Sequence, residues 1–318
     1  MNNRKNILVA DDIESIRFAI KDYLESSYNV YVADSGIQAM EILKNNSIDF
    51  IISDIRMPEM GGLELIQHVK KNYPDIQFAL MTAYNVNDYI EYARKENIWN
   101  IIPKSSSLDL SFIKTMIEKN LTGDIFGVEK YIPDLKKERI SYEDLISSGY
   151  KMSKNILYIL SASDPRICNS ACDAIGNLMV QAGCPSIIRQ VLDELVSNAI
   201  GHSMEKIKEK KVPVEISFGK INNKYIIGIL DHNGLLDREE ILYRIERHIK
   251  LDKNGLPVGI SDSHGRGLFI SRENLDHLIF NIEKNKKTEV IGFISEDISS
   301  KNKSLAVYQI ESAAAGKN

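Results

Sequence analysis

Short, fully apolar runs alternate with helical patterns over the first 120 residues of the chain. The runs lie at residues 7–10, 30–32, 50–53, 78–81 and 101–102. Between them, segments such as 15–25 and 36–44 carry apolar residues at helical spacing. Apolar runs bounded by turns are typical of strands that are buried on both faces of a parallel sheet. Five strand–helix units of this kind predict a doubly wound α/β domain on a five-stranded parallel sheet.

The pattern changes after about residue 153. A strand predicted at 156–160 precedes two long helical stretches, at 167–182 and 185–210. Further strands are predicted at 214–218, 225–230, 280–283 and 290–294, with a helix after Gly267. Long helices followed by a run of strands are typical of an α+β layer, in which helices cover a mixed or antiparallel sheet.

Residues 123–152 separate the two patterns. Turn residues and the charge cluster at 136–139 favour a connector with one or two short helices. Apolar residues such as Phe126 and Tyr131 make this stretch too apolar for a free linker, so we expect it to pack on one of the domains. The predicted organisation is a domain at 1–122, a packed connector at 123–152 and a second domain at 153–310.

Composition narrows the class of protein. The 318 residues are 43% hydrophobic and 26% charged, which fits about two globular domains. The formal net charge is only −4, so there is no basic excess to neutralise nucleic-acid phosphates, and we expect no direct DNA binding. The polar start is unlike a signal peptide, and no apolar stretch approaches the roughly 20 residues of a membrane span. We therefore expect a cytoplasmic protein without membrane contact.

Acidic residues follow two predicted strands of the first domain. Asp11 and Asp12 come directly after the first strand, and Asp54 follows the third. The carboxyl ends of parallel strands meet at one edge of a sheet, so these three carboxylates are expected to converge. Clustered carboxylates favour a hard divalent cation such as Mg²⁺. A carboxylate beside such an ion can act as a nucleophile on phosphorus and form an aspartyl phosphate.

Two further polar groups are predicted at the same edge. Thr82 ends the fourth strand and Lys104 follows the fifth. Lys104 can neutralise a transferred phosphoryl group, and the Thr82 hydroxyl can donate a hydrogen bond to it. Each acid taken alone is equally compatible with an N-cap or a turn. Five matching groups at the ends of four strands favour a catalytic site over that alternative.

These residues resemble the receiver domain of two-component response regulators, over about residues 5–121. The matching motifs are Asp11-Asp12, the run from Asp54 to Gly62, Thr82-Ala83 and Pro103-Lys104. The resemblance implies that Asp54 is the phosphoacceptor, and that a sensor histidine kinase or a phosphotransfer protein is the phosphoryl donor. The implied Mg²⁺ ligands are Asp11, Asp12, Asp54 and the backbone carbonyl of Arg56. The chain departs from the family at Ile101, where many receivers have a switching Tyr or Phe.

Three polar residues are predicted on one face of the helix within 185–210. Glu194, Asn198 and His202 are spaced four apart. They can form the solvated face of an amphipathic helix, but the apolar residues among them leave few exposed positions, so the stripe is expected to face a cavity. Asn198 offers a side-chain oxygen that suits Mg²⁺, and Glu194 can accept a proton from a hydroxyl substrate.

Two glycine-containing turns follow this helix. Asp231, at a predicted strand end, can accept a hydrogen bond from an adenine amino group, and Gly234 permits close backbone approach. Farther on, Gly265, Arg266 and Gly267 open a helix whose free amide groups suit phosphate. Arg266 can reach the phosphates or can simply be an exposed surface residue. Either turn alone is a weak signal, and their order along the chain carries the prediction.

Together these motifs resemble the ATP-binding domain shared by histidine kinases, gyrase and Hsp90 (the GHKL ATPase fold), over about residues 153–295. Glu194 and Asn198 match its N box, Asp231 and Gly234 its first glycine box. The second glycine box is matched by Gly265 and Gly267. The resemblance implies Mg-ATP binding, with residues 235–264 as the ATP lid. The charged residues of that segment favour a mobile, solvated lid.

The family has several branches. The six histidines lie at 68, 202, 232, 248, 264 and 277, so none can serve as a phosphoacceptor between 69 and 201. This disfavours an autophosphorylating histidine kinase. The domain is more similar to anti-sigma-factor serine kinases of the partner-switching type. That resemblance implies a Ser or Thr of a small antagonist protein as substrate, a sigma factor as a second partner, and a possible homodimer.

The predicted function is a response regulator, phosphorylated on Asp54, that controls an attached ATP-dependent serine/threonine protein kinase domain. Two alternatives remain open. One is a non-catalytic regulator in which ATP shapes a surface for a sigma factor or an adaptor. The other, less favoured, is a hybrid histidine-kinase relay.

Overall fold

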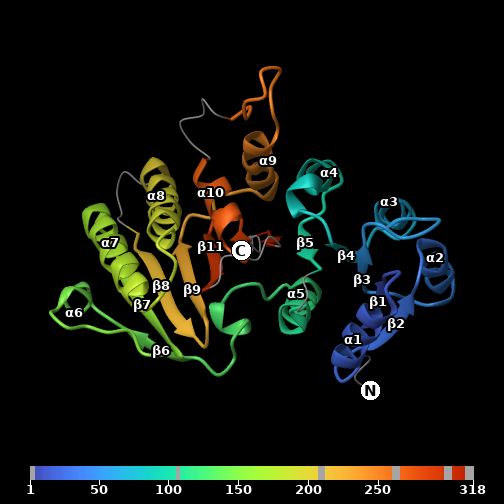
Figure 1. Ribbon diagram of the computed structural model, residues 1–318, viewed down its shortest axis with the longest axis horizontal. Helices are drawn as coiled ribbons and strands as arrows, with labels where there is room; N and C mark the ends of the chain where they lie inside the picture. Colours follow the sequence, from blue (N-terminus) through green and yellow to red (C-terminus); the bar gives the residue numbers. More distant parts are fainter. Residues whose placement is uncertain (1–3, 105–107, 207–211, 260–265, 297–302, 312–318) are drawn as a thin grey trace, which may run out of the picture. The chain divides into compact units, whose positions relative to one another are not determined.

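A computed structural model of the protein describes residues 4–104, 108–206, 212–259, 266–296 and 303–311, without the side chains of residues 202–206. The chain divides into two compact units, Met1–Ile125 and Phe126–Asn318. We refer to them as unit 1 and unit 2 and describe each by itself (Figure 1). Residues 126–152, predicted to be part of a connector, belong to unit 2.

Unit 1 is a parallel sheet with the strand order β2-β1-β3-β4-β5. Its strands are β1 (Asn6–Ala10), β2 (Asn29–Ala33), β3 (Phe50–Asp54), β4 (Gln77–Thr82) and β5 (Asn100–Pro103). Its helices are α1 (Glu14–Leu24), α2 (Gly36–Asn45), α3 (Gly62–Asn72), η1 (Val86–Tyr89), α4 (Ile90–Lys95) and α5 (Leu110–Thr122). The predicted five-stranded α/β fold is confirmed for this unit.

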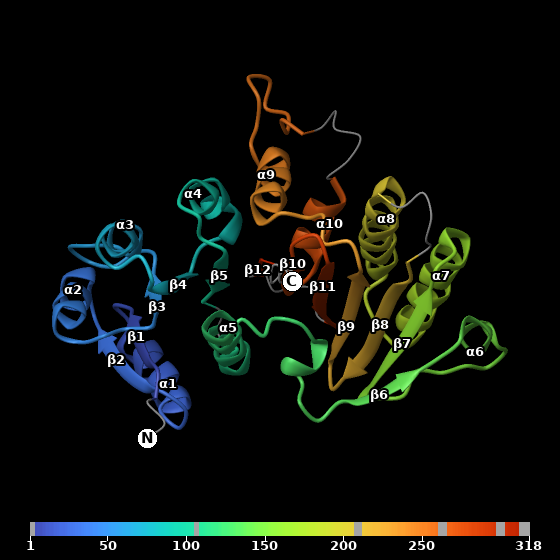
Figure 2. The same cartoon turned by 180° about the vertical axis from the view of Figure 1, so that it is seen from behind.

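The apolar runs of unit 1 are buried because helices cover both faces of its sheet. Helices α1 and α5 lie on one face, and α2, α3 and α4 lie on the other (Figures 1 and 2). Every residue of β3 is buried, as are four of the five residues of β1. All five strands point the same way, so the residues at their carboxyl ends share one edge of the sheet.

Unit 2 is a mixed sheet with the strand order β6-β7-β8-β9-β11-β10-β12. The pairs β6–β7 and β10–β12 are parallel, and the remaining neighbours are antiparallel. Its strands are β6 (Lys136–Arg139), β7 (Ile156–Ala162), β8 (Val214–Ile221), β9 (Lys224–Asp231), β10 (His277–Glu283), β11 (Lys287–Ser295) and β12 (Ser304–Ile310). Its helices are η2 (Val128–Lys130), α6 (Tyr142–Ile146), α7 (Pro165–Gln181), α8 (Ile188–Lys206), α9 (Arg238–Ile249) and α10 (Arg266–Asn274).

The two faces of this sheet are covered differently. Helices α7, α8 and α10 pack on one face, which we call the helix face (Figure 1). Residues 126–135 cover the opposite face. There the Tyr131 ring meets the Phe293 ring edge-on, 5.7 Å between centroids, and Gly127 N–H donates to the Glu289 carboxylate at 2.9 Å. The connector is therefore an integral layer of unit 2.

Two strands and one helix of unit 2 differ from the sequence expectations. Strand β12 was not predicted, and β6 coincides with the charge cluster at 136–139. Helix α9 lies within the predicted lid, but its residues Ile241, Leu242 and Ile245 are buried and it packs on α10. The expectation of a mobile, solvated lid is therefore wrong for residues 238–249, because an apolar stripe anchors them. Residues 260–264 of that segment lie outside the described residues.

In the described part of the chain, no helix is both long enough and apolar enough to cross a bilayer.

Candidate functional sites

A buried ion-pair cluster lies at the carboxyl edge of the unit 1 sheet. Lys104 Nζ is 2.7 Å from Asp11 Oδ2 and 2.6 Å from Asp54 Oδ2. The Lys104 side chain is only 5% exposed, and both carboxylates are buried. Strands β1, β3 and β5 position these three groups, because each residue ends or directly follows its strand. The structure thus brings together three of the predicted site residues.

The electrostatics of the cluster favour an incoming cation. Burial, the largest influence, raises the pKa of Asp54, and the neighbouring charge of Asp11 raises it further. Lys104 and a hydrogen bond from the Arg56 backbone N–H act in the opposite direction, and the net shift is upward. The effect of burial on Asp54 therefore outweighs that of Lys104, and a cation bound beside Asp54 would favour its ionised form.

The carboxylates of Asp11, Asp12 and Asp54 suit a divalent cation. One oxygen from each lies within 4.8 Å of the other two. Asp12 is exposed, whereas the other two are buried, so the cluster opens toward solvent on one side. Carboxylate oxygens are the ligands that Mg²⁺ prefers. These three residues would hold the ion, and the Arg56 N–H donates a hydrogen bond to the Asp54 carboxylate.

The remaining predicted residue of this edge is Thr82, at the end of β4. It is fully buried, and its Oγ1 accepts a hydrogen bond from the Tyr84 N–H at 2.9 Å. Its carbonyl accepts from the Lys104 N–H at 2.7 Å. The adjacent residue Met81 is in register with Asp54, so Thr82 lies one position beyond Asp54 on the neighbouring strand.

A glycine fixes the loop between β3 and α3. A Cβ on Gly62 would overlap the backbone oxygen of Asp54 and lie 2.6 Å from Ser53 Oγ. The Gly62 N–H donates to the Ile55 carbonyl at 3.0 Å and closes the loop. Only glycine allows α3 to begin this close to the end of β3, and this contact holds the Asp54 backbone in place.

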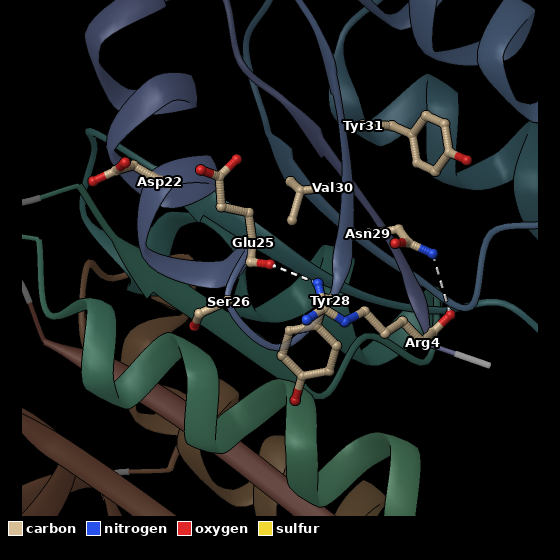
Figure 3. A pocket seen from close by; sticks show the side chains of 8 residues that line it. All are labelled: Arg4, Asp22, Glu25, Ser26, Tyr28, Asn29, Val30 and Tyr31. Atoms are coloured by element: carbon tan, nitrogen blue, oxygen red, sulfur yellow. Dashed lines mark hydrogen bonds between the residues drawn. The ribbon is translucent and has the colours of Figure 1, made fainter. Parts of the chain in front are cut away.

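A pocket on unit 1 lies at the other edge of the sheet. It is formed where α1 ends and β2 begins, and its lining includes Arg4, Glu25, Tyr28 and Asn29 (Figure 3). Arg4 Nη1 donates to the Glu25 carbonyl at 3.2 Å, and Asn29 Nδ2 donates to the Arg4 carbonyl at 3.4 Å. It contains none of the predicted site residues, and these contacts identify it as part of the packing between α1 and β2.

In unit 2, the structure brings Glu194 of α8 and Gly267 of α10 together. A Cβ on Gly267 would overlap the Glu194 carboxylate and lie 2.9 Å from Glu194 Cβ. The Glu194 side chain therefore fills the space that glycine leaves at the amino end of α10. Arg266, the first residue of α10, is exposed.

Asn198 lies one turn farther along α8. Its Nδ2 atom is buried and has no hydrogen-bond partner among the residues that the structure describes. A buried amide without a partner costs free energy, so natural proteins rarely keep one without a functional reason. The side chain of His202, another turn along, lies outside the described residues.

Asp231 ends β9 and is buried. Its Oδ1 accepts hydrogen bonds from the N–H groups of Asn233 at 2.9 Å and Gly234 at 3.4 Å. Gly234 has φ +57°, and a Cβ there would lie 2.6 Å from Lys286 N, at the β10–β11 turn. The close approach that Gly234 permits is therefore to the backbone of its own chain. Gly265 lies outside the described residues.

Thr288 is a candidate residue that the motifs did not reveal. It is directly opposite Asp231 in the β9–β11 pair. Alternation along β11 places Thr288 on the same face as Gly292, which packs against Leu275 after α10. Thr288 is buried, and its Oγ1 has no hydrogen-bond partner in the described part of the chain. Its position depends on sheet register, which no local motif encodes.

Comparisons with known proteins concern unit 1. Residues 7–116 match the family model of the response regulator receiver domain. The sensor kinase CckA of Brucella abortus is 29% identical over 124 residues, which are 37% of this chain and 13% of that protein. The DNA-binding transcriptional regulator NtrC of Escherichia coli is 30% identical over 104 residues, which are 32% of this chain and 22% of that protein.

Solved structures include a CheY-like response regulator receiver domain protein from Methanospirillum hungatei. The two are 23% identical in sequence, and their match covers 38% of this chain and 96% of the receiver domain protein, with a TM-score of 0.36. The chain spans less than a quarter of either curated relative, and their names describe different outputs. The match over residues 7–116 confirms the predicted receiver domain, which uses Mg²⁺ at an acidic pocket and implies a phosphoryl donor such as a sensor kinase.

Proposed function

Because residues 7–116 form a response regulator receiver domain, we propose that Asp54 is its phosphoacceptor and that phosphorylation controls an ATP-dependent output in unit 2. The output we propose is a serine/threonine protein kinase of the anti-sigma-factor type, acting in a partner-switching pathway. The observation that supports Asp54 as the phosphoacceptor is the buried Asp54–Lys104–Asp11 cluster.

The phosphorylation step uses residues already in place. An Asp54 carboxylate oxygen attacks the phosphorus of a phosphohistidine, the new O–P bond forms, and the P–N bond to the donor imidazole breaks. Lys104 can then neutralise the phosphoryl oxygens, and the Thr82 hydroxyl can donate to one of them. A Mg²⁺ held by the three carboxylates would supply positive charge to the transferring group.

The surface beside this edge suits a protein donor. Ile13 and Phe18 of the α1 region are 45% and 51% exposed, and Ile13 follows Asp12 directly. Exposed apolar side chains next to a reactive carboxylate favour docking of another protein over a small-molecule donor. A sensor histidine kinase or a phosphotransfer protein is the donor that fits this chemistry.

The phosphoacceptor is tested with acetyl phosphate and Mg²⁺. We expect the wild-type chain to gain one base-labile acyl phosphate and Asp54→Asn to gain none. Asp49→Asn is the matched control, because Asp49 is a partly exposed acid that pairs with Lys5 away from the cluster. Unchanged labelling of Asp54→Asn would show that the acceptor is another residue.

For unit 2, the proposal of ATP binding rests on Asn198 and Thr288. Both carry a buried polar atom without a partner in the described structure. Asn198 extends from α8, which packs on β9, and Thr288 stands opposite Asp231 at the end of that strand. A bound nucleotide would supply both partners: a phosphate oxygen would accept from Asn198 Nδ2 while Asn198 Oδ1 binds Mg²⁺, and an adenine ring held by Asp231 would bring a ring nitrogen to the Thr288 hydroxyl.

The kinase reaction would use Glu194. A Ser or Thr hydroxyl oxygen of the antagonist attacks the γ-phosphorus, its proton passes to the Glu194 carboxylate, and the bond to ADP breaks. The sequence has no histidine between 69 and 201 to serve a histidine-kinase relay. A hydroxyl acceptor on a separate protein therefore fits better.

The contact between Glu194 and Gly267 favours a second candidate function. A carboxylate packed against the amino end of α10 is stabilised by the helix dipole and is held where it is. Such a Glu194 would fix α10 rather than accept a proton. Unit 2 would then be a non-catalytic module in which ATP shapes a surface for a sigma factor or an adaptor.

Two measurements separate these functions. Asn198→Ala is expected to weaken Mg-ATP binding by more than about tenfold in calorimetry, whereas Asn177→Ala, an exposed residue of α7, should bind normally. Unaltered affinity of Asn198→Ala would exclude this nucleotide site. Incubation with γ-labelled ATP and an antagonist protein then decides between kinase and binder. Phosphate on the antagonist, lost in Glu194→Gln, supports the kinase.

A further inference from the structure

Arg56 contacts both the phosphoacceptor and the segment that leads into α4. Its backbone N–H donates a hydrogen bond to the Asp54 carboxylate. Its guanidinium lies over the Tyr84 ring, 4.1 Å from the ring centroid, and donates to the Tyr89 hydroxyl. One exposed residue therefore joins the end of β3 to two tyrosines that follow β4.

The two tyrosines anchor different parts of that segment. Tyr84 is 49% exposed, and its N–H donates to Thr82 Oγ1, so its backbone is tied to the phosphorylation edge. Tyr89 is 8% exposed, ends η1 and immediately precedes α4. The Arg56 side chain thus bridges a surface ring at the site and a buried ring at the start of a helix.

Strand β5, the neighbour of β4 on the side away from β3, offers no comparable link at Ile101. Strand β5 runs beside β4, and its residue Ile101 is in register with Leu80 and is buried. An isoleucine has no polar group that could respond to a phosphoryl group on Asp54. The Arg56–Tyr84–Tyr89 set is a polar connection from this edge to the start of α4.

We propose that Arg56 is a positioning residue that transmits the state of Asp54 to η1 and α4 through Tyr84 and Tyr89. The inference rests on the phosphorylation of Asp54 proposed above. A phosphoryl group adds about −1.5 to −2 of charge two residues from the guanidinium. A charge-assisted hydrogen bond to phosphate is stronger than a cation–π contact at an exposed site. Phosphorylation therefore draws the guanidinium from the tyrosines and releases the start of α4.

The chain carries its own reporter for this movement. Trp99 is its single tryptophan and lies in the turn between α4 and β5. We would phosphorylate the full chain with acetyl phosphate and Mg²⁺ and record Trp99 fluorescence. The phosphorylated fraction is measured by intact mass, so the response is expressed per phosphorylated chain.

We expect Tyr89→Phe, which lacks the hydroxyl acceptor, and Tyr84→Leu, which lacks the ring, to keep less than half of the wild-type response. Tyr84→Phe keeps the ring face that the guanidinium covers but loses the hydroxyl that also bonds to Arg56, so it should keep more of the response than Tyr84→Leu and less than wild type. A purely structural role of these residues would lower the melting temperature without changing the response per phosphorylated chain.

Three results would overturn the inference. One is a full response in both Tyr89→Phe and Tyr84→Leu. Another is a phosphorylated wild-type chain whose Trp99 fluorescence does not change. The last is a wild-type chain that takes no phosphate, which would also overturn the assignment of Asp54. The mass measurement distinguishes this case from the first two.

Discussion

The two candidate sites differ in how their polar groups are satisfied. In unit 1, Asp11 and Asp54 share a buried lysine, so the charged groups are paired before any ligand binds. In unit 2, Asn198 and Thr288 each bury a polar atom without a partner in the described structure. The first arrangement is organised by the protein itself, whereas we propose that a ligand completes the second.

This difference follows from sheet topology. The carboxyl ends of parallel strands lie at a single edge of the sheet, so residues that follow different strands are close together even when they are far apart in sequence. In the mixed sheet of unit 2, neighbouring strands run in opposite directions, and the candidate groups come from one strand end, one strand start and two helices. A site assembled in this way is expected to depend more on the ligand that we propose for it.

The largest effect that would test this comparison is expected from Lys104→Met. It leaves two buried carboxylates without their cation, and removal of one partner of a buried pair costs about 3–5 kcal/mol. Urea unfolding in EDTA should show this loss for the transition of unit 1. Addition of Mg²⁺ should restore part of it, because the ion replaces the lost positive charge.

Lys5→Met is the matched control for that measurement. Lys5 pairs with Asp49 at 2.7 Å, but its side chain is 54% exposed, and such pairs contribute at most about 1 kcal/mol. Equal losses in the two variants would mean that the cluster is no more self-contained than an ordinary surface pair.

The site of unit 1 could be predicted from sequence because each of its residues adjoins an apolar run. Each site residue ends or directly follows a strand, and the parallel topology places these strand ends at one edge: the residues are Asp11, Asp54, Thr82 and Lys104. The side-chain contacts of Arg56 could not be predicted in this way, because they join two irregular loops that have no periodicity.

In unit 2, local patterns found most elements but missed those that depend on tertiary context. Helix α9 has three buried apolar residues at helical spacing, yet its many charges suggested a solvated lid. Strand β12 is a short run near the chain end, and pairing with β10 makes it a strand. Thr288 belongs to no sequence motif, and only its register opposite Asp231 identifies it as a candidate site residue.

A smaller effect is expected from Gly267→Ala. The new Cβ would overlap the Glu194 carboxylate, and overpacking of this kind costs about 1–3 kcal/mol. The closest overlap is with the carboxylate, which Glu194→Ala removes, whereas the 2.9 Å approach to Glu194 Cβ remains, so Gly267→Ala combined with Glu194→Ala should recover part of the stability. A double-mutant cycle from urea unfolding measures the coupling. Additive losses would show that Glu194 does not fill this space, which would remove the argument for a non-catalytic unit 2.

The pH dependence of Asp54→Asn probes the charge balance in unit 1. The pKa of Asp54 is raised in the folded state, chiefly by burial, so its ionised form disfavours folding relative to its neutral form. The stability that wild type has while Asp54 is neutral is fully present below the unfolded-state pKa and is lost as pH rises through the folded-state pKa. Without Mg²⁺, Asp54→Asn should therefore melt above wild type at pH 7, with the difference shrinking in acid. A constant difference across this range would indicate that Lys104 compensates Asp54 fully.

The smallest change in stability, and the sharpest contrast between the units, is expected from Thr288→Val. Valine has nearly the same shape and removes a buried hydroxyl that has no partner among the described residues, so stability should stay equal or rise slightly. If a nucleotide supplies the missing partner, the same variant should bind Mg-ATP several-fold more weakly. Thr122→Val, whose hydroxyl bonds to the Glu118 carbonyl at 2.8 Å on exposed α5 surface, should leave affinity unchanged. A Thr288→Val chain that loses stability but keeps its affinity would mean that the hydroxyl serves the fold, and unit 2 would then be as self-contained as unit 1.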